Sequence, residues 1–213
     1  MVRKKLVAAA VLAAGSIGVA HAGYIDTSFS SGMTTQVTNA TVYDFNTGAK
    51  PVGYSGAGWI LPSSVQGMAA APAGDTTPFL SVAFPSSAGV ETFSAAPGAS
   101  YNYFGLYWGS IDDYNSLRFY DGASLLATIT GSDVIQSGTA LGDQVSAGSN
   151  RYVNFLLHDM SFDRVVFGTT SFAFESDNHA FATVPEPGTF ALMGAGLAAF
   201  AFMRRRRSAA VRA

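Results

Sequence analysis

An uncharged apolar run near the C-terminal end constrains this chain more than any other feature. Residues 190–203 contain only Phe, Ala, Leu, Met and Gly, and Arg204, Arg205, Arg206 and Arg207 follow directly. A helix of this length is about 21 Å long, shorter than the roughly 30 Å hydrocarbon core of a membrane. Length alone allows either a buried core helix or a short membrane span. Four consecutive arginines are too costly to bury beside a core helix, whereas positive charge is typical of the cytoplasmic flank of a span. We therefore expect a single C-terminal transmembrane helix.

Two prolines precede the apolar run. Pro185 and Pro187 flank Glu186. Proline donates no backbone hydrogen bond, and the residue before a proline favours an extended backbone. This segment is therefore expected to be extended, unpaired and accessible to a protease just outside the membrane.

The proline triplet, the short apolar span and the arginine cluster, in this order, resemble the PEP-CTERM sorting signal of Gram-negative bacterial surface proteins. The resemblance covers residues 184–207. It implies that a membrane-embedded exosortase recognises Pro185, Glu186 and Pro187 in an inner-membrane-anchored precursor, cleaves nearby and passes the protein outward. Residues 208–213 would then form a cytoplasmic tail. An ordinary membrane anchor that is never cut is the alternative.

The N-terminal end is consistent with export. Basic residues at positions 3–5 precede an apolar stretch over residues 6–20, and Ala20 and Ala22 fit the small-x-small rule for signal peptidase. We expect residues 1–22 to be a cleaved signal peptide, with an uncleaved anchor as the alternative. The chain contains no cysteine, so an exported domain depends on its core rather than on disulfides.

Charge separates the two ends from the region between them. The whole chain has a formal net charge of −2, but residues 23–184 hold only four basic against thirteen acidic side chains, a net charge of −9. A charge of this sign repels the nucleic acid backbone and anionic lipid. We expect no nucleic acid partner for a domain that works outside the cell.

Residues 23–183 are long enough for one domain with a hydrophobic core, and their pattern is that of β-strands. Asp121-Gly122 is a tight hairpin signal. Short apolar or aromatic runs separated by Gly, Ser and Asp turns predict an all-β, antiparallel sandwich of the jelly-roll kind. The strands are expected at residues 36–45, 79–84, 101–109, 117–120, 124–129, 152–158, 164–169 and 172–175.

A second resemblance rests on residues 103–115 and 117–122. These aromatic, glycine-punctuated residues are similar to a hairpin in a group of exosortase-dependent surface proteins. The resemblance implies a β-rich surface domain, and it assigns no biochemical role to it.

Alternation along this aromatic run predicts two faces. Phe104, Leu106 and Trp108 would point into the core together with Leu117 and Phe119. The opposite face would hold Tyr101, Tyr103, Tyr107, Ser116, Arg118 and Tyr120. Tyrosine rings on a flat sheet face can stack on sugar rings, which is the basis of a carbohydrate-binding hypothesis. The alternative is that these tyrosines only cover the rim of the sandwich.

Two acidic groups could supply hard oxygen ligands to a structural calcium ion. They are Asp112, Asp113 and Asn115 in one turn, and Glu175, Asp177 and Asn178 near the end of the domain. Neither group has the spacing of a twelve-residue calcium loop, and solvated turn acids are the alternative explanation. No other cofactor is expected.

Residues for enzyme chemistry are sparse. His158 with Asp159, or the separate His179, could form a triad with a serine, but no nucleophile elbow or zinc-binding helix accompanies them. We therefore expect no enzyme activity, and the family resemblance implies a surface or matrix protein that associates with extracellular polysaccharide. A lectin-like module is the first alternative and a secreted hydrolase the second.

Overall fold

Two antiparallel sheets packed face to face form the domain. The structure is a computed structural model that describes residues 23–135, 137, 139, 141–185, 188 and 192–200. Within these residues the elements are β1 (Tyr24–Ser30), β2 (Thr41–Tyr43), β3 (Tyr54–Gly56), β4 (Gly58–Leu61), β5 (Phe79–Val82), β6 (Gly89–Ser94), β7 (Tyr103–Trp108), β8 (Asn115–Asp121), β9 (Ser124–Thr130), α1 (Gly131–Val134), β10 (Arg151–His158), β11 (Arg164–Thr169) and β12 (Phe174–Ala182).

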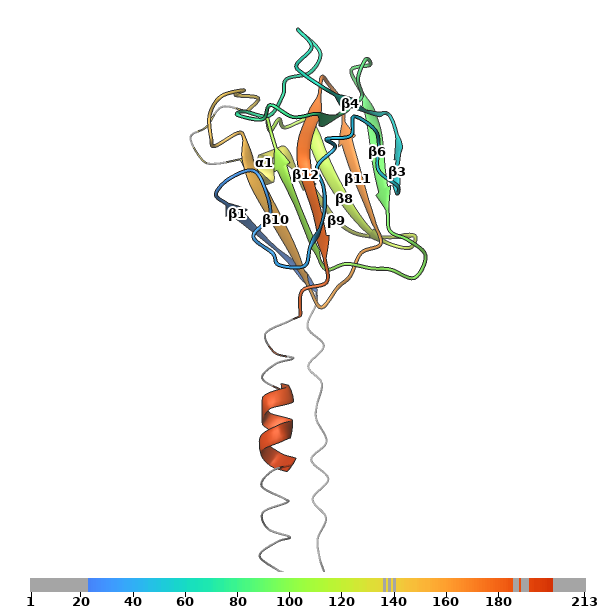
Figure 1. Ribbon diagram of the computed structural model, residues 1–213, viewed down its shortest axis with the longest axis vertical. Helices are drawn as coiled ribbons and strands as arrows, with labels where there is room; N and C mark the ends of the chain where they lie inside the picture. Colours follow the sequence, from blue (N-terminus) through green and yellow to red (C-terminus); the bar gives the residue numbers. More distant parts are fainter. Residues whose placement is uncertain are drawn as a thin grey trace, which may run out of the picture.

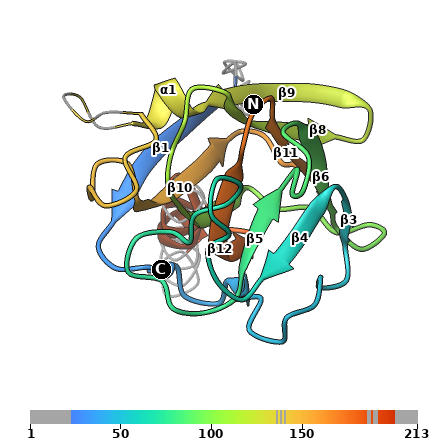
Figure 2. The same cartoon turned by 90° about the horizontal axis from the view of Figure 1, so that it is seen from above.

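The larger sheet has the strand order β1-β10-β7-β12-β5-β4, and β2 also pairs with β12. The smaller sheet has the order β3-β6-β11-β8-β9. Viewed from above, the two layers lie against each other (Figure 2). This arrangement confirms the prediction of a largely antiparallel β domain.

The strand connections confirm one predicted hairpin and contradict another. The predicted hairpin at Asp121-Gly122 is present, because β8 pairs with β9 and Gly122 has φ of 54°, a conformation that glycine adopts readily. The aromatic hairpin predicted between β7 and β8 is wrong. Strand β7 lies between β10 and β12 in the larger sheet, whereas β8 lies between β11 and β9 in the smaller one. Residues 109–114 therefore carry the chain from one sheet to the other.

Alternation along β7 and β8 nevertheless identified the core. Phe104, Leu106 and Trp108 of β7 are fully buried, as are Leu117 and Phe119 of β8. All five belong to the main cluster between the sheets. The Phe104 and Phe119 rings meet edge to face with centroids 6.0 Å apart, and burying each such ring stabilises the fold by about 1.5–3 kcal/mol.

Four strands were not predicted, namely β1, β3, β4 and β6. Strand β1 is an edge strand with mostly exposed residues, so it lacks a clear apolar alternation. Strands β3 and β4 are short and glycine-rich, and β6 buries Glu91 beside Phe93. In the predicted strand 36–45, only β2 is formed.

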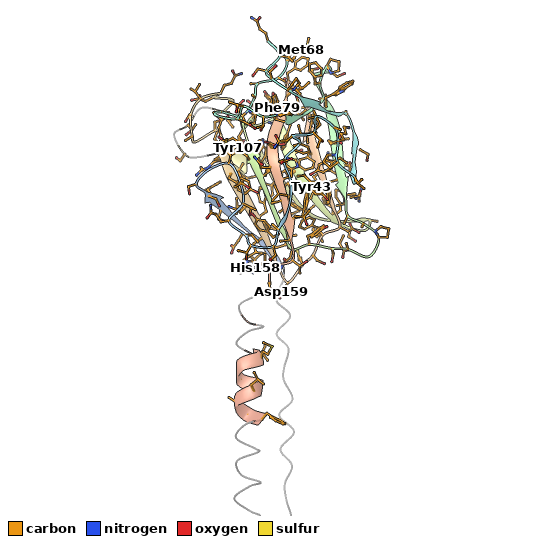
Figure 3. The ribbon with its side chains drawn as sticks, in the orientation of Figure 1. Tyr43, Met68, Phe79, Tyr107, His158 and Asp159 are labelled. Atoms are coloured by element: carbon orange, nitrogen blue, oxygen red, sulfur yellow. The ribbon has the colours of Figure 1, made fainter. Side chains whose placement is uncertain are left out.

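Both ends of the domain emerge on the same side. Tyr24 at the start of β1 pairs with His158, and Ala182 at the end of β12 pairs with Tyr103, which itself pairs with Leu156. The chain therefore enters and leaves the sheet next to His158, as Figures 1 and 3 show.

The targeting segments lie largely beyond the described residues. The predicted signal peptide with Ala20 and Ala22, the residues Glu186 and Pro187, and the arginines at 204–207 belong to this remainder. Residues 192–200 are helical. Among the residues that the structure describes, no helix is both long and apolar enough to cross a membrane.

Candidate functional site

The domain holds the chain firmly up to the residue before the proline triplet. The Asn102 side chain pairs with the backbone of Val184, accepting a hydrogen bond from its N–H at 2.6 Å and donating one to its carbonyl at 2.8 Å. Thr183 donates a hydrogen bond to the Ser100 carbonyl at 3.1 Å. Pro185, the next residue, is exposed. The predicted sorting triplet therefore begins where the hydrogen bonds of the domain end.

The helical segment 192–200 presents its large apolar side chains outward. Leu192, Met193, Leu197 and Phe200 are each at least 60% exposed. Such a surface is unfavourable in water and favourable in a lipid or protein environment. The segment is thus suited to contact with lipid or with an apolar protein surface.

The tyrosine face is covered, which is a correction to the sugar-stacking prediction. Tyr103 and Tyr107 are only 3% and 7% exposed. Their hydroxyls bond to loops that lie over the sheet, Tyr103 with Thr35 at 2.7 Å and Tyr107 with the Ala73 carbonyl at 2.6 Å. Tyr101 precedes the strand and packs against the main core instead. None of the three therefore offers a flat, accessible ring.

An acidic cavity of about 400 Å³ lies at the end of the domain away from the chain termini. Its lining includes Met68, Asp112, Tyr114 and Glu175, and Met68 marks this end in Figure 3. Glu175 is buried and accepts a hydrogen bond from the Ala70 N–H at 2.8 Å. Burial, reinforced by the charge on Asp112, raises the pKa of Glu175 to about 8. The cavity therefore holds a neutral carboxyl group at neutral pH.

Both predicted calcium groups are divided by the fold. Asp112 lines the cavity, whereas Asp113 is exposed and Asn115 is buried. In the other group, Glu175 reaches the cavity loop while Asp177, to which the Asn178 amide donates at 3.1 Å, lies next to Thr77. Within the described ranges, no three His, Asp or Glu side chains gather as a metal-binding group.

A second cavity adjoins an exposed tryptophan that the sequence reasoning did not select. Trp59 lies on the edge strand β4 and is 55% exposed. The cavity, of about 340 Å³, is lined by Trp59, Lys50, Gly48, Gly56, Gly58 and Ile60. Hydropathy patterns give no signal for such a residue, because its exposure depends on which strand forms the sheet edge.

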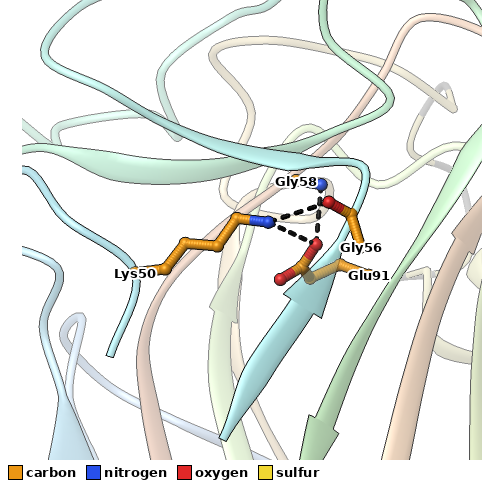
Figure 4. A network of polar contacts seen from close by, with 4 residues as sticks. All are labelled: Lys50, Gly56, Gly58 and Glu91. Atoms are coloured by element: carbon orange, nitrogen blue, oxygen red, sulfur yellow. Dashed lines mark hydrogen bonds and ion pairs between the residues drawn. The ribbon is translucent and has the colours of Figure 1, made fainter. Parts of the chain in front are cut away.

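Lys50 is fixed beside this tryptophan by a buried acid (Figure 4). Its Nζ donates to Glu91 Oε2 and to the Gly56 carbonyl, both at 2.9 Å. The same Glu91 oxygen accepts a hydrogen bond from the Gly58 N–H at 2.7 Å. An ammonium group has three donors, so one remains for a ligand in the cavity.

The two histidines considered for a hydrolytic triad lie in different surroundings. His158 lies 3.0 Å from Asp26 and stacks on Tyr24. His179 is fully buried, with one ring nitrogen 2.8 Å from the Ser176 hydroxyl and the other 2.8 Å from that of Tyr54. Burial lowers the pKa of His179 to about 3. The Ser176–His179 pair is therefore a neutral part of the core that a substrate cannot reach.

Comparison with known protein families identifies the C-terminal segment. The family description "PEP-CTERM protein-sorting motif" matches residues 183–207. Neither the curated proteins nor the solved structures that were compared include a match to the chain. The resemblance noted in the sequence is thus confirmed: the chain carries a PEP-CTERM sorting motif. The motif implies export through the membrane to the cell surface, with an exosortase as the processing partner.

Proposed function

We propose that this exosortase-sorted protein is a non-enzymatic component of the cell surface or extracellular matrix, which acts outside the cell after cleavage near Pro185 and associates with extracellular polysaccharide. The observation that carries the proposal is the junction between the domain and the sorting motif. The family match begins at Thr183, and the last residue that the domain holds is Val184. The folded domain therefore uses only the first two matched residues, and cleavage after Val184 would release it intact.

The arrangement of the domain supports this order of events. Both chain ends leave next to His158, while Met68, which lines the acidic cavity, lies at the opposite end (Figure 3). A precursor held by its C-terminal segment would direct its cavity end away from the membrane. The arginines at 204–207 would keep the end of the chain on the cytoplasmic side.

Alanine replacement of Pro185, Glu186 and Pro187 tests the proposal. We expect the variant to accumulate as an uncleaved precursor in the membrane fraction, because an exosortase no longer recognises it. Intact mass and cell fractionation in the native host, with and without its exosortase, give the result. The matched control replaces Gly188 and Thr189 by alanine. Normal release of the triplet variant would refute sorting through this motif.

A lectin-like module is the second candidate function, and the Trp59 cavity favours it. An exposed indole offers an apolar face to a sugar ring. The remaining donor of Lys50 can reach a hydroxyl or carboxylate oxygen on that sugar. The ligand favoured by this pair is a neutral or uronic-acid sugar unit of a polysaccharide.

Affinity electrophoresis through gels that contain the extracellular polysaccharide of the native host tests this second function. We expect Trp59→Ala to weaken retention about tenfold, since one aromatic contact contributes about 0.5–1.5 kcal/mol beyond its buried area. Val52→Ala is the control, because Val52 is 93% exposed and lies outside the cavity. Equal retention of Trp59→Ala and the unaltered protein would exclude this cavity as the binding site.

A further inference from the structure

Two acidic side chains face each other where the loop between β4 and β5 lies against the larger sheet. Asp75 comes from this loop and Asp177 from β12. The Thr77 hydroxyl lies between them, 2.6 Å from Asp75 Oδ1 and 3.2 Å from Asp177 Oδ2. One hydroxyl carries one hydrogen, so Thr77 can donate to only one of the two carboxylates at a time.

Beyond the contact between the two carboxyl groups, the other oxygen of each has no partner. Asp177 is fully buried, and its Oδ1 makes no hydrogen bond. Asp75 Oδ2 is likewise buried and without a partner. Within the described residues, the ion pairs are Lys50 with Glu91 and His158 with Asp26, so neither acid is neutralised by a basic side chain. Buried carboxylates normally have partners, and this pair leaves two oxygens open.

In the part of the chain that the structure describes, no basic side chain pairs with either acid. Tyr107 lies near Asp75, and Tyr152 lies near Asp177. Arg151 lines the neighbouring cavity, but its guanidinium lies over the Phe29 ring at 3.4 Å. Two adjacent carboxylates, of which Asp177 is fully buried and Asp75 half-buried, need either a shared proton or a cation.

We propose that Asp75 and Asp177, with the hydroxyl of Thr77, bind a divalent cation of the calcium type. Calcium prefers carboxylate, hydroxyl, carbonyl and water oxygens in flexible geometry, and its two charges would balance the two acids. Ala73 and Gly74, which directly precede Asp75 in the chain, line a cavity of about 460 Å³ together with Tyr107. This site differs from both groups that the sequence suggested, since Asp75 belonged to neither.

Binding of the cation would fix the loop 62–78 on the sheet. This loop already contacts the sheet through the Ala70 N–H on Glu175 and the Ala73 carbonyl on Tyr107. The same loop forms one wall of the acidic cavity near Met68. The cation therefore orders this cavity as well as stabilising the domain.

Isothermal titration of the full-length protein in detergent with calcium chloride at pH 7.5, after removal of metal by a chelator, tests the site. We expect one calcium ion per chain and a rise in melting temperature on binding. Asp177→Asn should abolish measurable calcium binding, because it removes one of the two charged oxygen ligands. Asp113→Asn is the matched control, because Asp113 is exposed and outside the pair. Affinity should fall at pH 5.5, where protons compete for the carboxylates.

Asp75→Asn is the second variant in case Asp177→Asn does not fold, since Asp75 lies in a loop rather than in the central sheet. Loss of calcium binding in either folded variant would support the site. A folded protein that takes up no calcium and is stabilised only by acid would show that the pair shares a proton, which overturns the proposal. Equal binding by the variants and the unaltered protein would overturn it too.

Discussion

At the scale of single residues, β12 carries three ionisable side chains that are all shifted toward their neutral forms. Burial raises the pKa of Glu175 and Asp177 to about 8 and lowers that of His179 to about 3. Glu175 and Asp177 contact the loop 62–78, whereas His179 stacks on Phe167 in the core. Desolvation disfavours the charged form in each case. In the absence of a bound cation, the strand thus avoids buried charge at neutral pH without many basic partners.

The Glu175→Gln variant tests this interpretation through the pH dependence of stability. Because the pKa of Glu175 is raised from 4.5 to about 8, its contribution to the free energy of unfolding is present below pH 4.5 and is lost as the pH rises toward 8. Asp112 and Tyr114 are the titratable groups that act on it. We expect the variant to lose less stability between pH 5 and pH 8 than the unaltered protein. Urea unfolding with a metal chelator present measures this difference.

Asp113→Asn is the control for that measurement, because Asp113 is an exposed acid close to the same cavity. Its pH profile should match that of the unaltered protein. Below pH 6.5 the buried His179 acts in the opposite direction and destabilises the domain as the pH falls. An unchanged slope for Glu175→Gln above pH 6.5 would contradict the assigned role of Glu175.

At the scale of elements, β7 is the central strand of the larger sheet. It pairs with β10 on one side and β12 on the other, and all six of its residues are buried. Its inward rings reach the smaller sheet, where Phe104 meets Phe119 and Phe167 edge to face. Its outward tyrosines are covered by loops. Both faces of β7 therefore contribute to the core.

Phe104→Ala should destabilise the domain by about 3–5 kcal/mol, because it removes a fully buried ring and leaves a cavity between the sheets. Leu125→Ala on β9 is the control, since Leu125 is 53% exposed, and its effect should stay within about 0.5 kcal/mol. Urea unfolding of both full-length variants in the same detergent gives the comparison. A loss for Phe104→Ala no larger than that of the control would mean that the two sheets do not pack through this ring.

At the scale of the whole molecule, both chain ends leave the domain on one side, so its two ends differ. The register of β1, β10, β7 and β12 brings residues 24 and 182 to one end. Loop 62–78 and the acidic cavity lie at the other. A sorting signal attached at the first end leaves the second free to face outward before cleavage, and the whole domain free afterwards.

The sequence by itself determined the features that depend on local composition and order. The sorting motif is recognisable because prolines, an apolar run and arginines follow one another directly. The inward residues of β7 and β8 followed from alternation, and the β8–β9 hairpin followed from Asp121-Gly122. These signals need only neighbouring residues, since backbone geometry and side-chain period are set locally.

Only the tertiary structure decided which strands share a sheet and which surfaces stay open. It placed β7 and β8 in different sheets, covered Tyr103 and Tyr107, and left Trp59 exposed on an edge strand. It also brought Asp75 within reach of Asp177, about a hundred residues further along the chain. Such contacts depend on how loops cross a sheet face, and the free energy that selects them comes from packing over the whole domain rather than from any local segment.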